Sequence, residues 1–183
     1  MASIDVTVRG AGIFGLTVAY ACARRGARVR VIDPGGPGAG ASGGVVGALA
    51  PHTPERWNAK KEFQFESLIM AEAFWAEVDA LSGLSSGYAR LGRLQPVADE
   101  RALALAEERA EAARTLWRGQ ACWTVTDAPD DWGPISATGR VIRDTLTARL
   151  HPARACTSLA AAIRAQGGEL TTEGADAGAV VWA

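Results

Sequence analysis

The sequence has few cysteines and almost no net charge, and each shortage excludes a class of protein. The three cysteines, Cys22, Cys122 and Cys156, are far apart and form no CxxC pair. We therefore expect no metal site and no disulfide framework, which fits a reducing compartment. The formal net charge of −1 offers no basic face of the kind that nucleic-acid binding needs. Nucleic acid is thus not the expected partner.

The sequence also lacks a long hydrophobic run. No stretch approaches the roughly 18 to 20 consecutive apolar residues of a membrane-spanning helix, and the first eight residues are too short and too polar for a signal peptide. The remaining composition, with 48% hydrophobic and 21% charged residues over 183 positions, is that of a globular chain with a real core. We expect a cytoplasmic protein with no membrane partner.

The first 32 residues carry the pattern of a strand, a turn, a helix and a second strand. Residues 4–8 alternate apolar and polar side chains, and residues 14–25 form an alanine-rich stretch that Gly26 would end. Residues 28–32 predict the second strand. Such a βαβ unit places its two strands parallel in one sheet. The sequence therefore predicts an α/β fold with a Rossmann-like βαβ domain.

A glycine turn links the first expected strand to the helix, because residues 10–15 read GAGIFG, a GxGxxG motif. Gly10 allows the tight turn, Gly12 lets a pyrophosphate approach the backbone, and Gly15 lets the helix lie close to the sheet. The first-turn N–H groups and the helix dipole would stabilise the phosphates. Asp33, at the end of the second strand, is placed to accept hydrogen bonds from the adenosine ribose. The alternative is a structural turn followed by an exposed aspartate.

The βαβ unit alone does not separate FAD from NAD, but the segment after it does. Residues 40–52, GASGGVVGALAPH, resemble the second glycine-rich segment of the glycine oxidase and D-amino-acid oxidase (DAO) family of FAD-dependent oxidoreductases. Three further segments resemble the same family: LGRLQ at 91–95, HP at 151–152 and VVWA at 180–183. The resemblance covers nearly the whole chain, but only about the first half of such an enzyme.

The resemblance implies FAD as the cofactor and a first group of contacts at its pyrophosphate and ribose. The backbone of Ile13 and Phe14 is expected beside the pyrophosphate. Asp33, followed by Pro34, is expected at the ribose. Together with the three glycines of the turn, Gly10, Gly12 and Gly15, they make up the first group of expected FAD contacts.

The resemblance implies a second group of contacts in the second glycine-rich segment. Ala41 and Ser42 are expected on the phosphate side, Ser42 through its hydroxyl. Val46, Gly47 and Ala48 are expected beside the flavin ring, where the small Gly47 leaves room. The alternative is a mobile loop over residues 42–48.

The family resemblance also implies a domain plan. Residues 1–90 would belong to the FAD-binding part, residues 91–145 to part of an inserted α+β substrate domain, and residues 146–183 to the returning FAD-binding domain. The arginine and tyrosine types that act in such oxidases would lie beyond residue 183, so no catalytic residue is assigned. A second chain or a C-terminal half would complete the fold.

The implied activity is oxidation of a carbon–nitrogen bond in a small amine or amino acid, with hydride transfer to the flavin. Two alternatives stay open. One is the related flavin domain of a tRNA-modifying enzyme, against which the near-zero net charge speaks weakly. The other is a catalytically silent fragment that binds FAD or another protein.

Overall fold

The computed structural model describes residues 3–183, and the chain divides into two compact units. Unit 1 comprises Met1–Gly47, Ala73–Tyr88 and Leu150–Ala183, and unit 2 comprises Ala48–Glu72 and Ala89–Arg149. Within residues 3–183, no helix is long and apolar enough to cross a membrane.

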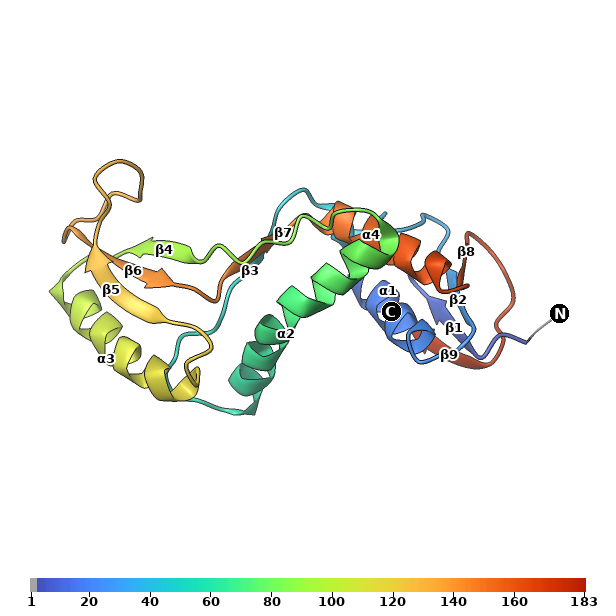
Figure 1. Cartoon of the computed structure of the whole chain (residues 1–183), viewed down its shortest axis with the longest axis horizontal. Helices are drawn as coiled ribbons and strands as arrows, with labels where there is room; N and C mark the ends of the chain where they lie inside the picture. The colour runs from blue at the N-terminus through green and yellow to red at the C-terminus, as the bar shows by residue number, and fades with distance from the viewer. Residues whose placement is uncertain (1–2) are drawn as a thin grey trace. The chain divides into compact units, whose positions relative to one another are not determined.

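Unit 1 is built on a four-stranded sheet with the strand order β8-β2-β1-β9 (Figure 1). All three strand pairings are parallel. Val8 of β1 and the two valines and the isoleucine of β2 are almost fully buried, as β-branched side chains in a covered parallel sheet usually are. The predicted α/β fold with a parallel sheet is confirmed. The strands are β1 (Val6–Arg9), β2 (Val29–Ile32), β8 (Glu169–Thr171) and β9 (Ala179–Trp182).

Two helices of unit 1, α1 (Ile13–Ala23) and α4 (Pro152–Ala165), pack against each other. Pro152 occupies the first turn of α4, where its missing N–H costs no hydrogen bond. Tyr20 of α1 is fully buried, and its hydroxyl donates a 2.7 Å hydrogen bond to Glu77. Burial, followed by this hydrogen bond, raises the pKa of Tyr20 to about 12. Glu77 belongs to α2 (Ala59–Ser82), which runs from unit 2 into unit 1.

Unit 2 contains a three-stranded antiparallel sheet with the order β4-β6-β5 and the helix α3 (Glu100–Leu116) (Figure 1). Asp99 caps α3, because its side chain accepts a 2.7 Å hydrogen bond from the N–H of Ala102. Trp117 lies at the centre of an aromatic core, with ring centroids 6.5 Å from Phe65 and 6.0 Å from Trp123. The strands are β4 (Arg93–Pro96), β5 (Trp123–Asp127) and β6 (Arg140–Asp144).

The structure contains strands that the sequence pattern did not predict. Strand β5 lies within residues 119–139, where Pro129 and Pro134 make the sequence look irregular. Strands β3 (Gly47–Leu49) and β7 (Ala148–Leu150) form a two-stranded sheet. Three-residue strands are too short to show a periodicity, so they depend on pairing with distant segments. A 3-10 turn, η1 (Ala41–Gly43), also forms inside the second glycine-rich segment.

Candidate dinucleotide site

The glycine turn joins β1 to α1 in a conformation that requires glycine at two positions. Gly10 has a φ of +115°, and a Cβ there would overlap the carbonyl oxygen of Ala183. A Cβ on Gly15 would overlap the carbonyl oxygen of Gly10. Gly12 is different, since its Cβ would meet only the Ser42 hydroxyl oxygen, at 3.3 Å. The first two glycines are therefore needed by the fold, whereas Gly12 borders open space.

The first turn of α1 presents backbone donors. Gly12 is the N-cap and provides no side-chain hydrogen bond. The N–H of Ile13 donates to the Ser42 hydroxyl at 3.0 Å. Within residues 3–183, the N–H groups of Phe14 and Gly15 donate no hydrogen bond, as is usual at the start of a helix. Free N–H groups at the positive end of a helix dipole are suited to bind an anion such as a phosphate.

Asp33 follows β2 and is fixed next to the turn by both of its carboxylate oxygens. One oxygen accepts a 2.7 Å hydrogen bond from the N–H of Ala11, and the other accepts a 2.8 Å bond from the N–H of Gly35. The N–H of Asp33 donates to Thr171 at the end of β8. Each carboxylate oxygen keeps a lone pair, so Asp33 can still accept hydrogen bonds from a ligand hydroxyl. Pro34 follows with an exposed side chain.

A small cavity of about 100 Å³ opens beside Asp33. It lies where β2 and β8 end, and its lining combines apolar side chains with polar groups. Its position at the carboxyl end of parallel strands is where open α/β sheets bind their ligands. The lining residues are Ala11, Val31, Asp33, Gly36, Pro37, Arg164, Leu170, Thr171 and Thr172.

The second glycine-rich segment (residues 40–52) and the residues just before it are held in place at several points. The N–H of Gly38 donates to Ala11 of the turn at 2.8 Å, and the carbonyl of Gly44 accepts a 3.1 Å bond from Ala153 of α4. The Ser42 hydroxyl accepts the hydrogen bond from the N–H of Ile13 in the turn, whereas the side chain of neighbouring Ala41 is exposed.

Buried Cys156 of α4 packs beneath this segment, with its Sγ 3.9 Å from the Ser42 carbonyl oxygen, and burial raises the pKa of its thiol. Gly47 is the last residue of this segment that belongs to unit 1. Val46, just before it, is 81% exposed. A Cβ on Gly47 would lie 3.1 Å from Pro152. Ala48 is exposed and is the first residue of unit 2.

Sequence reasoning missed part of the cavity wall. It assigned no role to Arg164. It also assigned no residue near Thr171 and Thr172, because only about a dozen residues, 167–178, stand where the resembling family has a strand and a small β-meander. The only available signal was the position of α4 just before a short parallel strand. No residue of the chain is assigned a catalytic role.

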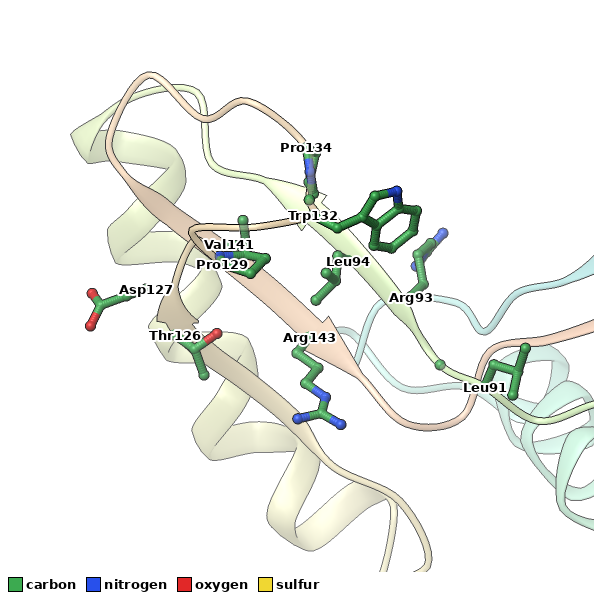
Figure 2. Close-up of a pocket in the computed structure, with 12 residues that line it drawn as sticks. Leu91, Arg93, Leu94, Thr126, Asp127, Pro129, Trp132, Pro134, Val141 and Arg143 are labelled. Atoms are coloured by element: carbon green, nitrogen blue, oxygen red, sulfur yellow. The ribbon is translucent and has the colours of Figure 1, made fainter.

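Unit 2 contains a larger cavity, of about 980 Å³, on the face of its sheet (Figure 2). Leu94 and Arg143 are paired residues of β4 and β6 that line it, and Trp132 lies over it with 82% of its side chain exposed. Arg93 at its rim pairs with buried Asp144 at 3.2 Å. Within residues 3–183, the guanidinium of Arg143 makes no hydrogen bond or ion pair. This cavity contains none of the predicted cofactor residues.

Comparison with known protein families identifies the family of the chain. A family model described as "FAD dependent oxidoreductase" (DAO) matches residues 5–179. The chain belongs to the DAO family of FAD-dependent oxidoreductases. FAD is therefore the cofactor of the family, and the turn, Asp33 and the free N–H groups of α1 fit a dinucleotide.

Individual proteins of known structure are similar over most of this chain. Glycine oxidase from Geobacillus kaustophilus matches with a TM-score of 0.67 and 20% identity, covering 91% of this chain and 45% of that one. L-amino acid deaminase from Proteus myxofaciens matches with a TM-score of 0.70 and 19% identity, covering 100% and 44%. At such identities these structures show the fold alone, and this DAO-family chain spans less than half of their length.

A curated relative is more similar in sequence, over a short segment. The tRNA 5-methylaminomethyl-2-thiouridine biosynthesis bifunctional protein MnmC of Paracidovorax citrulli is 54% identical over 49 residues. The match covers 26% of this chain and 8% of that protein. The chain thus corresponds to a small part of the curated relative.

Proposed function

We propose that this DAO-family chain binds FAD and forms the cofactor-binding part of an amine or amino-acid oxidase. The observation that carries the proposal is the glycine turn at the start of α1, where the N–H groups of Phe14 and Gly15 donate no hydrogen bond to any of residues 3–183. Those donors have the position and the charge preference that a pyrophosphate needs. Asp33, which the turn itself orients, would then hold the ribose hydroxyls.

The other predicted residues would complete the site. Ser42 would place its hydroxyl on the phosphate side, where it already bonds to the N–H of Ile13. The exposed Val46 and the small Gly47 would pass beside the flavin ring. When bound, FAD would supply the hydride acceptor for oxidation of a carbon–nitrogen bond. The part played by the chain is to bind and orient the cofactor.

A small amine or amino acid is the substrate class that we propose. The structural likeness to a glycine oxidase and an L-amino acid deaminase supports it. We also propose the domain plan of residues 1–90, 91–145 and 146–183, in which the middle region contributes to the substrate side. A second chain or a C-terminal half would provide the remaining substrate contacts.

The segment shared with an MnmC protein favours a second candidate, the flavin domain of a tRNA-modifying enzyme. The net charge of −1 gives this chain no general attraction to RNA phosphates. Hydrogen peroxide formed with glycine, sarcosine or D-amino acids would support the oxidase. Turnover confined to tRNA that carries an aminomethyl group would support the second candidate.

The test of the proposal is FAD binding by the purified chain and by Gly12→Val. We expect the parent chain to quench FAD fluorescence saturably and Gly12→Val to lose that binding, because its side chain would occupy the pyrophosphate position. Circular dichroism should show that the variant is folded, since a Cβ at Gly12 meets only the Ser42 hydroxyl.

A matched control is Ala104→Val, which adds a valine on an exposed position of α3 and should leave binding unchanged. A parent chain that fails to bind FAD would overturn the proposal. A Gly12→Val variant that binds as well as the parent would show that the pyrophosphate lies elsewhere.

A further inference from the structure

Arg164 is a charged residue in the wall of the cavity beside Asp33 that has no role in the fold. It lies in the last turn of α4 and lines the cavity of about 100 Å³ together with Val31 and Leu170. Its side chain is exposed, and within residues 3–183 its guanidinium makes no hydrogen bond or ion pair. Glu169, the acidic residue that begins β8, is already paired with Arg30 at 2.8 Å.

The lining of the cavity is suited to a flat, mostly apolar ring. The half-buried Leu170, with Val31 behind it in the lining, makes part of the wall apolar, while Arg164 adds a planar cation to the lining. A guanidinium stacks well on an aromatic face, through both its delocalised charge and its flat shape. Asp33 in the same cavity would repel a further phosphate on the ribose. The ring face, rather than an additional phosphate, is therefore the group that this lining fits.

We propose that Arg164 packs its guanidinium on the adenine ring of the bound dinucleotide and so strengthens the binding of ligands that contain adenosine, such as FAD and ADP. This inference rests on the proposed FAD function. FMN has no adenosine, so it gains nothing from Arg164. The role differs from that of Asp33, which is directed at the ribose, and from that of the glycine turn, which is directed at the pyrophosphate.

A plainer explanation for Arg164 is that it is a solvated residue at a helix C-terminus. A cation there interacts favourably with the helix dipole, and this would leave cofactor affinity unaffected. The two explanations differ in what a substitution does to binding, so equilibrium affinities decide between them.

The experiment compares dissociation constants for FAD, ADP and FMN in the parent chain, Arg164→Ala and Arg164→Lys. For Arg164→Ala we expect FAD and ADP to bind about 2- to 30-fold more weakly, the range that cation–π contacts span, with FMN unchanged. Arg164→Lys keeps the charge without the flat guanidinium and should fall between the two. Arg25→Ala is the matched control, because Arg25 is exposed and, among the described residues 3–183, its guanidinium bonds only to the carbonyl of Ala21.

The outcomes separate this inference from the proposed function. A parent chain that does not bind FAD overturns both. A parent that binds FAD, with Arg164→Ala binding it equally well, overturns the role of Arg164 and leaves the proposed function intact. Equal weakening of FAD and FMN would also overturn the assignment to adenine, because the lost contact would then lie outside the adenosine.

Discussion

The glycine turn of unit 1 excludes side-chain atoms, whereas the core of unit 2 is filled by large side chains. The glycine turn has no room for a Cβ at Gly10 or Gly15. The core of unit 2 is filled by large rings, with Trp117 fully buried between Phe65 and Trp123. Adding atoms should therefore damage the first region, and removing atoms should damage the second. The groups that the turn offers to a ligand are mainly backbone N–H groups, and they are accessible because glycine has no side chain to cover them.

The largest expected effect is that of Trp117→Ala. Removing a buried tryptophan leaves a cavity, and the expected loss of unfolding free energy is about 3 to 5 kcal/mol. Trp117→Phe should cost less, because it keeps ring contacts and removes an indole N–H that is buried without a partner in residues 3–183. Urea unfolding gives the free energies, and hydrogen exchange by segment locates the change.

Trp132→Ala is the matched control for Trp117→Ala, because Trp132 is 82% exposed. It should leave the free energy of unfolding nearly unchanged. The comparison of the two units would fail if Trp117→Ala increased exchange in residues 3–47 as much as in residues 89–149. The two units would then open as one cooperative structure.

Gly15→Ala should have the next largest effect, in the opposite region and by the opposite change. The added methyl would overlap the Gly10 carbonyl oxygen, which is backbone and cannot move aside cheaply. We expect a loss of about 1 to 3 kcal/mol from this overpacking, although alanine is otherwise the better helix former. Faster hydrogen exchange in α1 and β1 would confirm it. The control is Val18→Ala on the partly exposed side of α1, and a Gly15→Ala variant as stable as the parent would contradict the predicted overlap.

The sequence was sufficient to predict the turn because its information is local. A tight turn, a close helix and an acidic residue after the second strand each restrict one position, so Gly10, Gly15 and Asp33 are recognisable without the fold. Ser42 was singled out through the family resemblance, as a residue of the phosphate side, whereas its hydrogen bond with Ile13 was not predicted. The predicted roles of the cofactor residues toward FAD remain predictions.

What the sequence could not show depends on contacts between distant segments. Strand β8 is three residues long and is defined by its pairing with β2, more than 130 positions earlier. The cavity wall that includes Arg164 exists only because of that pairing. Strand β5 was missed for the same reason, since Trp123 and Val125 become strand residues by pairing with β6. Short strands obtain their stability from tertiary partners, which local propensity does not report.

The smallest expected effect is that of Glu55→Gln in unit 2, and its pH dependence is informative. Glu55 accepts hydrogen bonds from Arg109 at 2.8 and 2.9 Å. The Arg109 guanidinium holds the pKa of the Glu55 carboxyl below its ordinary value of 4.5. Because the pKa is lower in the folded chain, the pair stabilises the fold at pH values above 4.5, and this contribution is lost as pH falls through the folded value.

At pH 7 we expect Glu55→Gln to lower the free energy of unfolding by about 0.2 to 1 kcal/mol, as is typical of a partly exposed ion pair. The difference from the parent should shrink toward zero as pH falls below 4.5. Glu111→Gln is the matched control, since the pair of Glu111 and Arg114 is mostly exposed and its loss should be undetectable. A difference that grew on acidification would mean that Glu55 is stabilised in its protonated form, and the ion pair would not be the source of its contribution. The contrast between unit 2 and the glycine turn would then depend on the aromatic rings of unit 2 alone, and not on its ion pairs.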